Sequence, residues 1–152
     1  MATPRSDVRV AAWELLLRVQ VGLVVILDDE LQQAAGLPLR WYDLLLELNR
    51  APSRQLRMSE LGERVVLSRT RVSRVVEELE HVGLVRREQD DEDRRSWFAV
   101  LTDEGRRRFR RAAPHYVHGI EKHFGQHLAD AEASTMRDAL QRVLAAAGGT
   151  MP

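Results

Sequence analysis

Cysteine is absent from the 152 residues, which excludes disulfides, zinc–thiolate sites, cysteine nucleophiles and thiol redox sensing. Lysine occurs once, as Lys122, and all other basic residues are arginine. Arginine is favoured for bidentate contacts to phosphate and guanine, but here it occurs along the whole chain, which indicates a GC-rich genome instead. The sequence also lacks a Gly-rich phosphate loop, a nucleophile elbow and paired carboxylates. We therefore expect no enzyme activity and no cofactor.

A long uninterrupted apolar run is also missing. The most apolar window, Val8–Leu27, contains Arg9, Glu14, Arg18 and Gln20, whereas a membrane span needs about 20 nearly continuous apolar residues. The N-terminus carries Arg5, Asp7 and Arg9 before the first apolar stretch, and we expect no signal peptide. We expect one soluble, cytoplasmic domain without a membrane partner.

The formal net charge is zero, but the charges are unevenly distributed. Residues 53–111 hold 15 arginines and 12 acidic residues, a net charge of +3, whereas residues 1–52 carry −2 and residues 112–152 carry −1. Three arginines and no acid lie within Ser68–Val76. This basic segment is the place to look for nucleic-acid contacts.

The first predicted helix, from about Asp7 to Ala35 with Ser6 as N-cap, is apolar on more than one face. Such a helix must be buried nearly all round, and at roughly 40 Å it is too long for one small domain to surround. A second subunit could bury it. The alternative is a central core helix of a monomer.

The remaining pattern predicts a mainly α fold with a small β-hairpin. Ser59 and Ser68 are expected to cap helices, Gly83 to stop one, and Pro114 to kink or break one. The predicted helices are Leu39–Arg50, Glu60–Val66, Ser68 to Gly83, Asp103–Gln126 and Asp130–Ala147, and the predicted strands are Leu84–Glu88 and Trp97–Leu101.

The two short helices around Val66-Leu67-Ser68 have helix-turn-helix spacing. On the second helix Val72, Val75, Val76 and Leu79 share one face, which can anchor it to the body. The opposite face suits contacts with base edges and phosphates. The predicted DNA-binding residues there are Ser68, Arg69, Thr70, Arg71, Ser73 and Arg74.

The hairpin that follows is a candidate wing, although its tip, Asp90–Arg95, holds four acids and two arginines. We expect Asp93 to pair with an arginine and brace the turn. Arg95 would then enter the minor groove, with Arg94 on the backbone or in the brace. Asp90 and Asp91 would point away from DNA. The alternative is a solvated hairpin tip.

Taken together, these stretches resemble the multiple antibiotic resistance regulator (MarR) family of bacterial transcription factors. The most specific marks are Asp-x-Arg in the wing (Asp93, Arg95) and Leu-Thr-x-x-Gly after it (Leu101, Thr102, Gly105). The stretch Leu61-Gly-Glu-Arg-Val and the segment Ser68–Leu79 belong to the same pattern, which covers nearly the whole chain.

The resemblance implies a homodimeric winged helix-turn-helix repressor. Residues 39–102 would form the DNA-binding lobe, and residues 7–35 and 103–147 would form the dimerisation helices. Two lobes would read a pseudo-palindromic double-stranded DNA operator until a small, phenolic or anionic effector releases it. Cysteine is lacking, so the thiol switch of the peroxide-sensing branch is excluded. The alternatives are a winged-helix module that binds protein and a small ligand-binding or enzymatic helical protein.

Weaker signals concern ligands. By the resemblance, Trp13, Trp41 and Tyr42 are candidate effector-pocket residues, although aromatic residues at helical positions are more often core. His115/His118 and His123/His127 have spacings that a metal could use, but no further ligand joins them. We therefore expect no metal site. The alternatives are histidines on the surface or at the dimer interface, which could be sensitive to pH.

Overall fold

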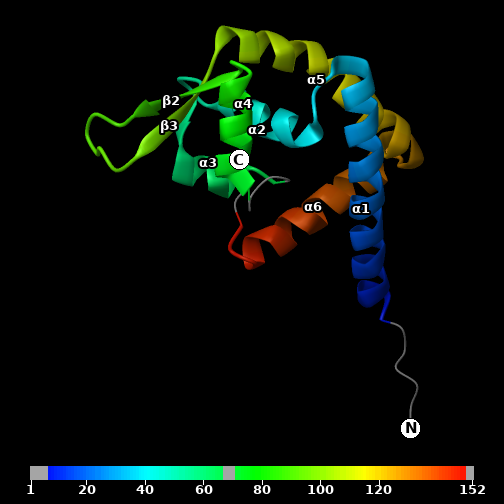
Figure 1. Cartoon of the computed structure of the whole chain (residues 1–152). Coiled ribbons are helices and arrows are strands. Elements are labelled where there is room, and N and C mark those ends of the chain that lie inside the picture. The colour runs from blue at the N-terminus through cyan, green and yellow to red at the C-terminus, as the bar shows by residue number, and fades with distance from the viewer. Residues whose placement is uncertain (1–6, 67–70, 150–152) are drawn as a thin grey trace.

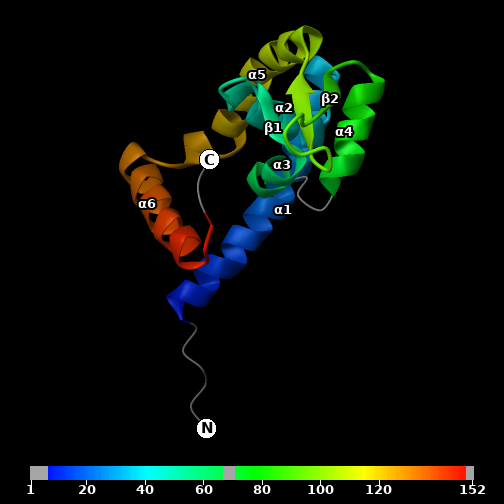
Figure 2. The same cartoon turned by 90° about the vertical axis from the view of Figure 1, so that its left-hand side faces the viewer.

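The computed structural model describes residues 7–66 and 71–149, and it shows a compact lobe from which two helical arms project (Figures 1 and 2). Helix α1 extends beyond the lobe towards the N-terminus, and α6 projects from the far end of α5. The elements are α1 (Val8–Ala35), α2 (Leu39–Arg50), β1 (Gln55–Arg57), α3 (Met58–Arg64), α4 (Val72–His81), β2 (Val85–Gln89), β3 (Trp97–Leu101), α5 (Asp103–His123), the 3-10 helix η2 (Gly125–His127) and α6 (Asp130–Ala146). The predicted fold class is confirmed.

The sheet has three strands rather than the two of a plain hairpin. The order is β1-β3-β2, with both pairings antiparallel, and Leu56 of β1 faces Ala99 of β3. The segment around Leu56 was expected only to be extended. Its partner lies more than forty residues further along the chain, so local sequence does not reveal the pairing.

Capping residues fix where the helices begin. The Asp7 carboxylate accepts a hydrogen bond from Arg9 N (3.0 Å) and caps α1, so the described cap is not the predicted Ser6, which lies outside the described residues. Asp28 of α1 caps α2 by accepting from Leu39 N at 2.7 Å. Helix α3 begins before Ser59, and Glu60 accepts from Arg57 N at 3.2 Å, so the prediction that Ser59 caps this helix is wrong.

Helix α5 continues through Pro114, so the expected break is absent from this helix. Proline removes one backbone donor to the carbonyl of the residue four positions before it. Pro114 and Arg110 are both exposed, so water can satisfy that carbonyl. The helix then ends at His123, three residues earlier than expected.

The core lies in the lobe, where α2, α4, α5 and the sheet meet. Leu44, Leu45, Leu48 and Leu79 are fully buried there, and Tyr42 packs between Phe109 (5.2 Å between ring centroids) and Tyr116 (4.6 Å). By contrast, only Leu27 and Leu31 of the long α1 are buried, and α6 has no buried residue. The two arms therefore present apolar surface that the other described residues do not cover.

Candidate nucleic-acid interface

Helix α4 presents a basic face to solvent because its apolar face is fixed in the core. Val72, Val75, Val76 and Leu79 are each at most 7% exposed, as their spacing predicts. Arg71, Ser73 and Arg74 lie on the outer face and are exposed. Of the other predicted contacts, Ser68, Arg69 and Thr70 lie outside the described residues. The described part of the surface has the composition expected for groove contact.

Two carboxylates, one buried on α2 and one half-buried on α4, join helix α2 to its neighbours. Asp43 of α2 is 8% exposed and accepts a hydrogen bond from Val66 N (3.1 Å), at the start of the turn between α3 and α4. Glu78 of α4 accepts from Trp41 Nε1 at 2.9 Å and from Arg40 Nη2 at 3.1 Å. Helix α2 is therefore joined to the segment that follows α3 through Asp43 and to α4 through Glu78.

Two of the three acidic residues of α4, Glu78 and Glu80, are paired within the lobe. The Trp41 hydrogen bond, followed by Arg40, keeps the pKa of Glu78 below its usual value. Arg87 of β2 contacts Glu80 at 2.7 Å and likewise lowers the pKa of that carboxyl. Both carboxyls are ionised. Glu80 is paired with Arg87, whereas Glu78 also lies 3.6 Å from Arg74 and offsets part of its charge.

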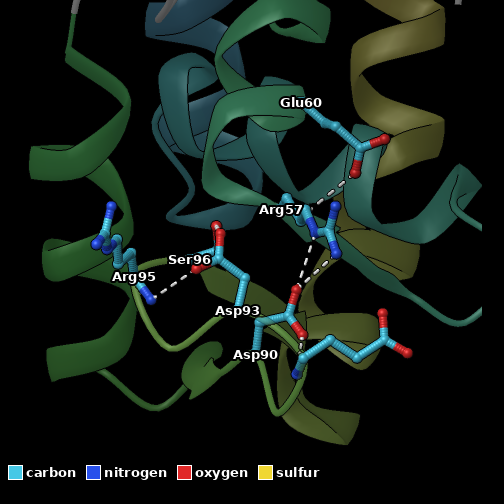
Figure 3. A network of polar contacts seen from close by, with 7 residues as sticks. Arg57, Glu60, Asp90, Asp93, Arg95 and Ser96 are labelled. Atoms are coloured by element: carbon cyan, nitrogen blue, oxygen red, sulfur yellow. Dashed lines mark hydrogen bonds and ion pairs between the residues drawn. The ribbon is translucent and has the colours of Figure 1, made fainter.

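The wing is fastened where β2 ends and the tip loop begins, by an ion pair that the sequence did not predict. Asp90, 5% exposed, accepts from Arg57 Nη2 (2.6 Å) and Nε (3.0 Å), and Glu92 N donates to its other oxygen at 2.9 Å (Figure 3). The Glu92 amide, then Arg57, lowers the pKa of Asp90. Arg57 also stacks over Phe98 of β3 at 5.6 Å. Asp90 therefore points inwards and joins the wing to the start of α3.

Asp93 orders the tip, but through other partners than expected. Its carboxylate accepts from Arg95 N (3.1 Å) and from Ser96 Oγ (2.8 Å), and its carbonyl accepts from Ser96 N (2.8 Å). The carboxylate that pairs with an arginine side chain is Asp90, so that detail of the prediction for Asp93 is wrong. A short carboxylate within a tight turn reaches nearby backbone amides more readily than a side chain.

The two arginines of the tip are exposed. The side chain of Arg95 points away from the Arg57–Asp90 pair (Figure 3). Arg94 is held by its backbone, because its carbonyl accepts from Gln89 Nε2 at 2.6 Å. Neither guanidinium forms an ion pair with the described residues, so both are available to an external anion.

A single chain does not gather the three aromatic residues proposed for an effector pocket. Trp41 faces α4 and Tyr42 lies in the core at 4% exposure. Trp13 is 57% exposed and lies about 20 Å along α1 from Asp28, the residue that contacts α2. Trp41 contacts α4 through its hydrogen bond to Glu78.

The histidines of α5 show no metal-binding geometry. Among residues 7–66 and 71–149, no group of three or more histidine and acidic side chains is arranged to hold an ion. His123 Nε2 instead lies 2.8 Å from Glu30 Oε1, which also accepts from Lys122 Nζ at 2.7 Å. These contacts join α5 to α1.

Comparison with known proteins identifies relatives of the whole chain. A sequence model of the MarR family matches residues 35–96. A MarR family transcriptional regulator from Streptomyces coelicolor, solved in complex with DNA, is 34% identical, with a TM-score of 0.82 over 94% of this chain and 91% of that one. No curated protein sequence matches this chain.

Two further Streptomyces coelicolor structures extend the comparison. AbsC, a MarR family transcriptional regulator, is 32% identical, with a TM-score of 0.85 over 98% of this chain and all of its own. The transcriptional regulator PcaV, solved with its natural ligand, is 29% identical, with a TM-score of 0.74 over 97% of this chain and 99% of that one. The similarity therefore includes both arms as well as the lobe.

Proposed function

This chain belongs to the MarR family of transcriptional regulators, and from that premise we propose that it acts as a homodimeric repressor of a pseudo-palindromic operator. The observation that carries the proposal is the exposed basic face of α4 (Arg71, Ser73, Arg74) beside the exposed wing arginines Arg94 and Arg95. Two such lobes would place their recognition helices in successive major grooves, about one helical turn apart.

A second copy of the chain is the proposed cover for the apolar arms. Nine large hydrophobic side chains of α1 are at least 40% exposed, among them Val21 (64%) and Val25 (66%). By length and composition α1 could also cross a membrane. Glu14 and Arg18 lie within its apolar stretch, however, and a bilayer penalises such charges. Residues 7–35 and 103–147 are therefore the proposed dimerisation region, with residues 39–102 as the DNA-binding lobe.

Release by a small molecule is the finer part of the proposal. It is supported by PcaV, a relative whose structure contains its natural ligand. We assign a phenolic or anionic effector to the region of Trp13, Trp41 and Tyr42. Trp13 would have to come from the partner, since one chain keeps it away from the other two. A ligand that draws Trp41 away from Glu78 would loosen α4.

Selection of bound duplexes from a random library tests the function. Arg71→Ala and Arg74→Ala should each weaken binding to the selected duplex by about 1–3 kcal/mol where the side chain reads a base. Arg107→Ala is the matched control, because Arg107 pairs with Glu104 on α5 at 2.7 Å. A steep dependence of affinity on salt is expected from counterion release.

The rival function is a winged helix that binds an acidic protein. It predicts weak duplex binding without sequence preference, so no duplex would be enriched. Enrichment of a palindrome that binds Arg71→Ala as tightly as the wild type would instead reject the assignment of the α4 face.

A further inference from the structure

A concavity of about 480 Å³ lies where the C-terminal end of α1 passes helix α5 (Figure 1). One wall is formed by the small side chains of Ala34 and Ala35 of α1. The other wall is formed by three basic residues of α5, namely Arg108, Arg111 and His115. None of the described residues that line it is acidic. The concavity therefore combines an apolar wall with a row of hydrogen-bond donors.

The three basic residues form a row because their spacing follows the helical repeat. Positions i, i+3 and i+7 share one face of an α-helix. At 1.5 Å per residue, Arg108 and His115 are about 10 Å apart along the axis of α5. Arg111 and His115 are exposed, and Arg108 is half-buried. A ligand that contacts the whole row is therefore longer than a single carboxylate or phosphate group.

Helix α1 fixes the position of Arg108 through one hydrogen bond. Its Nη2 donates to Gly36 O, just after the end of α1, at 3.0 Å. This acceptor is neutral, and a guanidinium carries five N–H donors in a rigid plane. Among residues 7–66 and 71–149, neither Arg108 nor His115 forms an ion pair. Arg108 is therefore a preorganised donor whose charge the described residues do not pair.

The carboxylates closest in sequence to Arg108 and to Ala34 are engaged with other bases. On α5, Glu104 contacts Arg107 at 2.7 Å, and its contact with Arg111 is longer, at 3.7 Å. The hydrogen bond from Arg107 is the main cause that lowers the pKa of Glu104. On α1, Glu30 accepts from a lysine at the far end of α5 at 2.7 Å. The row of bases is therefore left with one long carboxylate contact.

We propose that this concavity binds a small organic dicarboxylate. A guanidinium can donate two parallel hydrogen bonds to one carboxylate, which suits Arg108 and Arg111. The imidazole of His115 can donate to the second carboxylate. The methyl groups of Ala34 and Ala35 would contact the hydrocarbon between the two charged groups. A compact inorganic phosphate would bridge neighbouring bases but leave the alanine wall unused.

The concavity is distinct from the DNA-reading face. Helix α5 begins next to the C-terminal end of α4, where Thr102 donates to Gly83 O at 2.7 Å, whereas Arg71 lies at the N-terminal end of α4. Trp13, one of the residues assigned to the effector, lies about 30 Å along α1 from Ala34. Dicarboxylate binding can therefore be measured without DNA, and its failure would leave the proposed repressor function untouched.

Calorimetric titration of the full chain with adipate, a flexible dicarboxylate, tests the proposal. Arg111→Ala should weaken binding about tenfold, the effect of losing one charge-assisted hydrogen bond. The Arg111 side chain is 69% exposed, so the variant should fold normally. Ala34→Glu should remove measurable binding, because its carboxylate would occupy the concavity and repel the ligand. Glutamate is a good helix former, so α1 should persist.

Arg110→Ala is the matched control, because it removes the same charge from an exposed position of α5 outside the concavity. It should bind adipate within about twofold of wild type, since solvent screens a charge at that position. Thermal melting of each variant without ligand verifies that it is folded.

The absence of binding heat with adipate at millimolar concentration would overturn the proposal. An equal loss of affinity in Arg110→Ala and Arg111→Ala would do the same, since net charge alone would then attract the anion. Hexanoate, a monocarboxylate, should bind at least about tenfold more weakly than adipate. Affinity for hexanoate or inorganic phosphate equal to that for adipate would show that a pair of carboxylates is not recognised.

Discussion

The Trp41 indole N–H donates to Glu78 Oε2 at 2.9 Å, and this hydrogen bond links α2 directly to the recognition helix. Arg40 contacts the same oxygen at 3.1 Å, and Arg74 lies 3.6 Å from the other oxygen. Arg74 is proposed to contact DNA, and Trp41 positions the helix that carries Arg74. Both side chains therefore contact the Glu78 carboxylate. We therefore expect a change at Trp41 to affect the proposed DNA-binding face of α4.

Trp41→Phe should reduce the free energy of unfolding by about 1 kcal/mol, because it removes one hydrogen bond to a carboxylate but keeps most of the ring packing. Operator affinity should fall as well, since α4 becomes less firmly positioned. Urea unfolding and fluorescence anisotropy measure the two effects. Trp97→Phe, at a 45% exposed wing position, is the control and should change stability little. Wild-type stability and affinity in Trp41→Phe would reject the link.

Gly105→Ala should destabilise the fold strongly. A Cβ at this position would lie 2.0 Å from Leu84 O and 2.8 Å from Leu101 Cδ1, so the start of α5 would have to move away from the sheet. We expect a loss of about 2–3 kcal/mol, the range for overpacking. Gly62→Ala in α3, where a Cβ would meet nothing within 4 Å, should be neutral or stabilising. Thermal melting of the two variants compares them, and equal melting temperatures would contradict the steric argument.

The segment from Leu101 to Gly105 shows which features of the fold can be predicted from the sequence. The Leu-Thr-x-x-Gly motif was read as a family mark, and the structure gives its reason: Thr102 Oγ1 accepts from Gly105 N (3.0 Å) and donates to Gly83 O (2.7 Å), while Gly105 allows the close approach. The buried face of α4 was also predictable, because helical periodicity places Val72, Val75, Val76 and Leu79 together. Local patterns of this kind can be read directly from the chain.

Contacts between distant segments could not be read in this way. Asp90 was expected only to face away from DNA, because nothing near it in the sequence indicates Arg57, thirty-three residues earlier. The Trp41–Glu78 bond was missed for the same reason.

Asp90→Asn should loosen the wing and change the response to acid. The folded-state pKa of Asp90 is lowered, so its carboxylate contributes stability above its usual pKa, and this contribution is lost as the pH falls through the lower folded value. The variant should therefore melt at a lower temperature at pH 7, and its melting temperature should fall less than that of wild type between pH 5 and pH 3. Asp91→Asn, at an exposed neighbour, should follow the wild-type curve. Parallel curves for all three proteins would refute the proposed anchor.

Val25→Glu should prevent association, because it places a charge on the apolar face of α1 that the partner is proposed to cover. Light scattering after gel filtration should give twice the 17.4 kDa chain mass for wild type and a larger monomer fraction for the variant. Val82→Glu adds the same charge at a 47% exposed position beside α4 and should leave the dimer intact. A wild-type protein that elutes as a single chain at micromolar concentration would disprove the dimer.

Arg95→Ala should weaken operator binding by about 1–3 kcal/mol and reduce the preference for A·T pairs at the flanks of the site. A narrow A·T-rich minor groove concentrates negative potential, and a guanidinium inserted there depends on that potential. Arg94→Ala is the matched control: a backbone contact should weaken all sequences alike and leave the flank preference unchanged. Binding to duplexes with A·T or G·C flanks separates the two effects. If Arg94→Ala instead abolished the flank preference, the two wing arginines would have the reverse of their proposed roles.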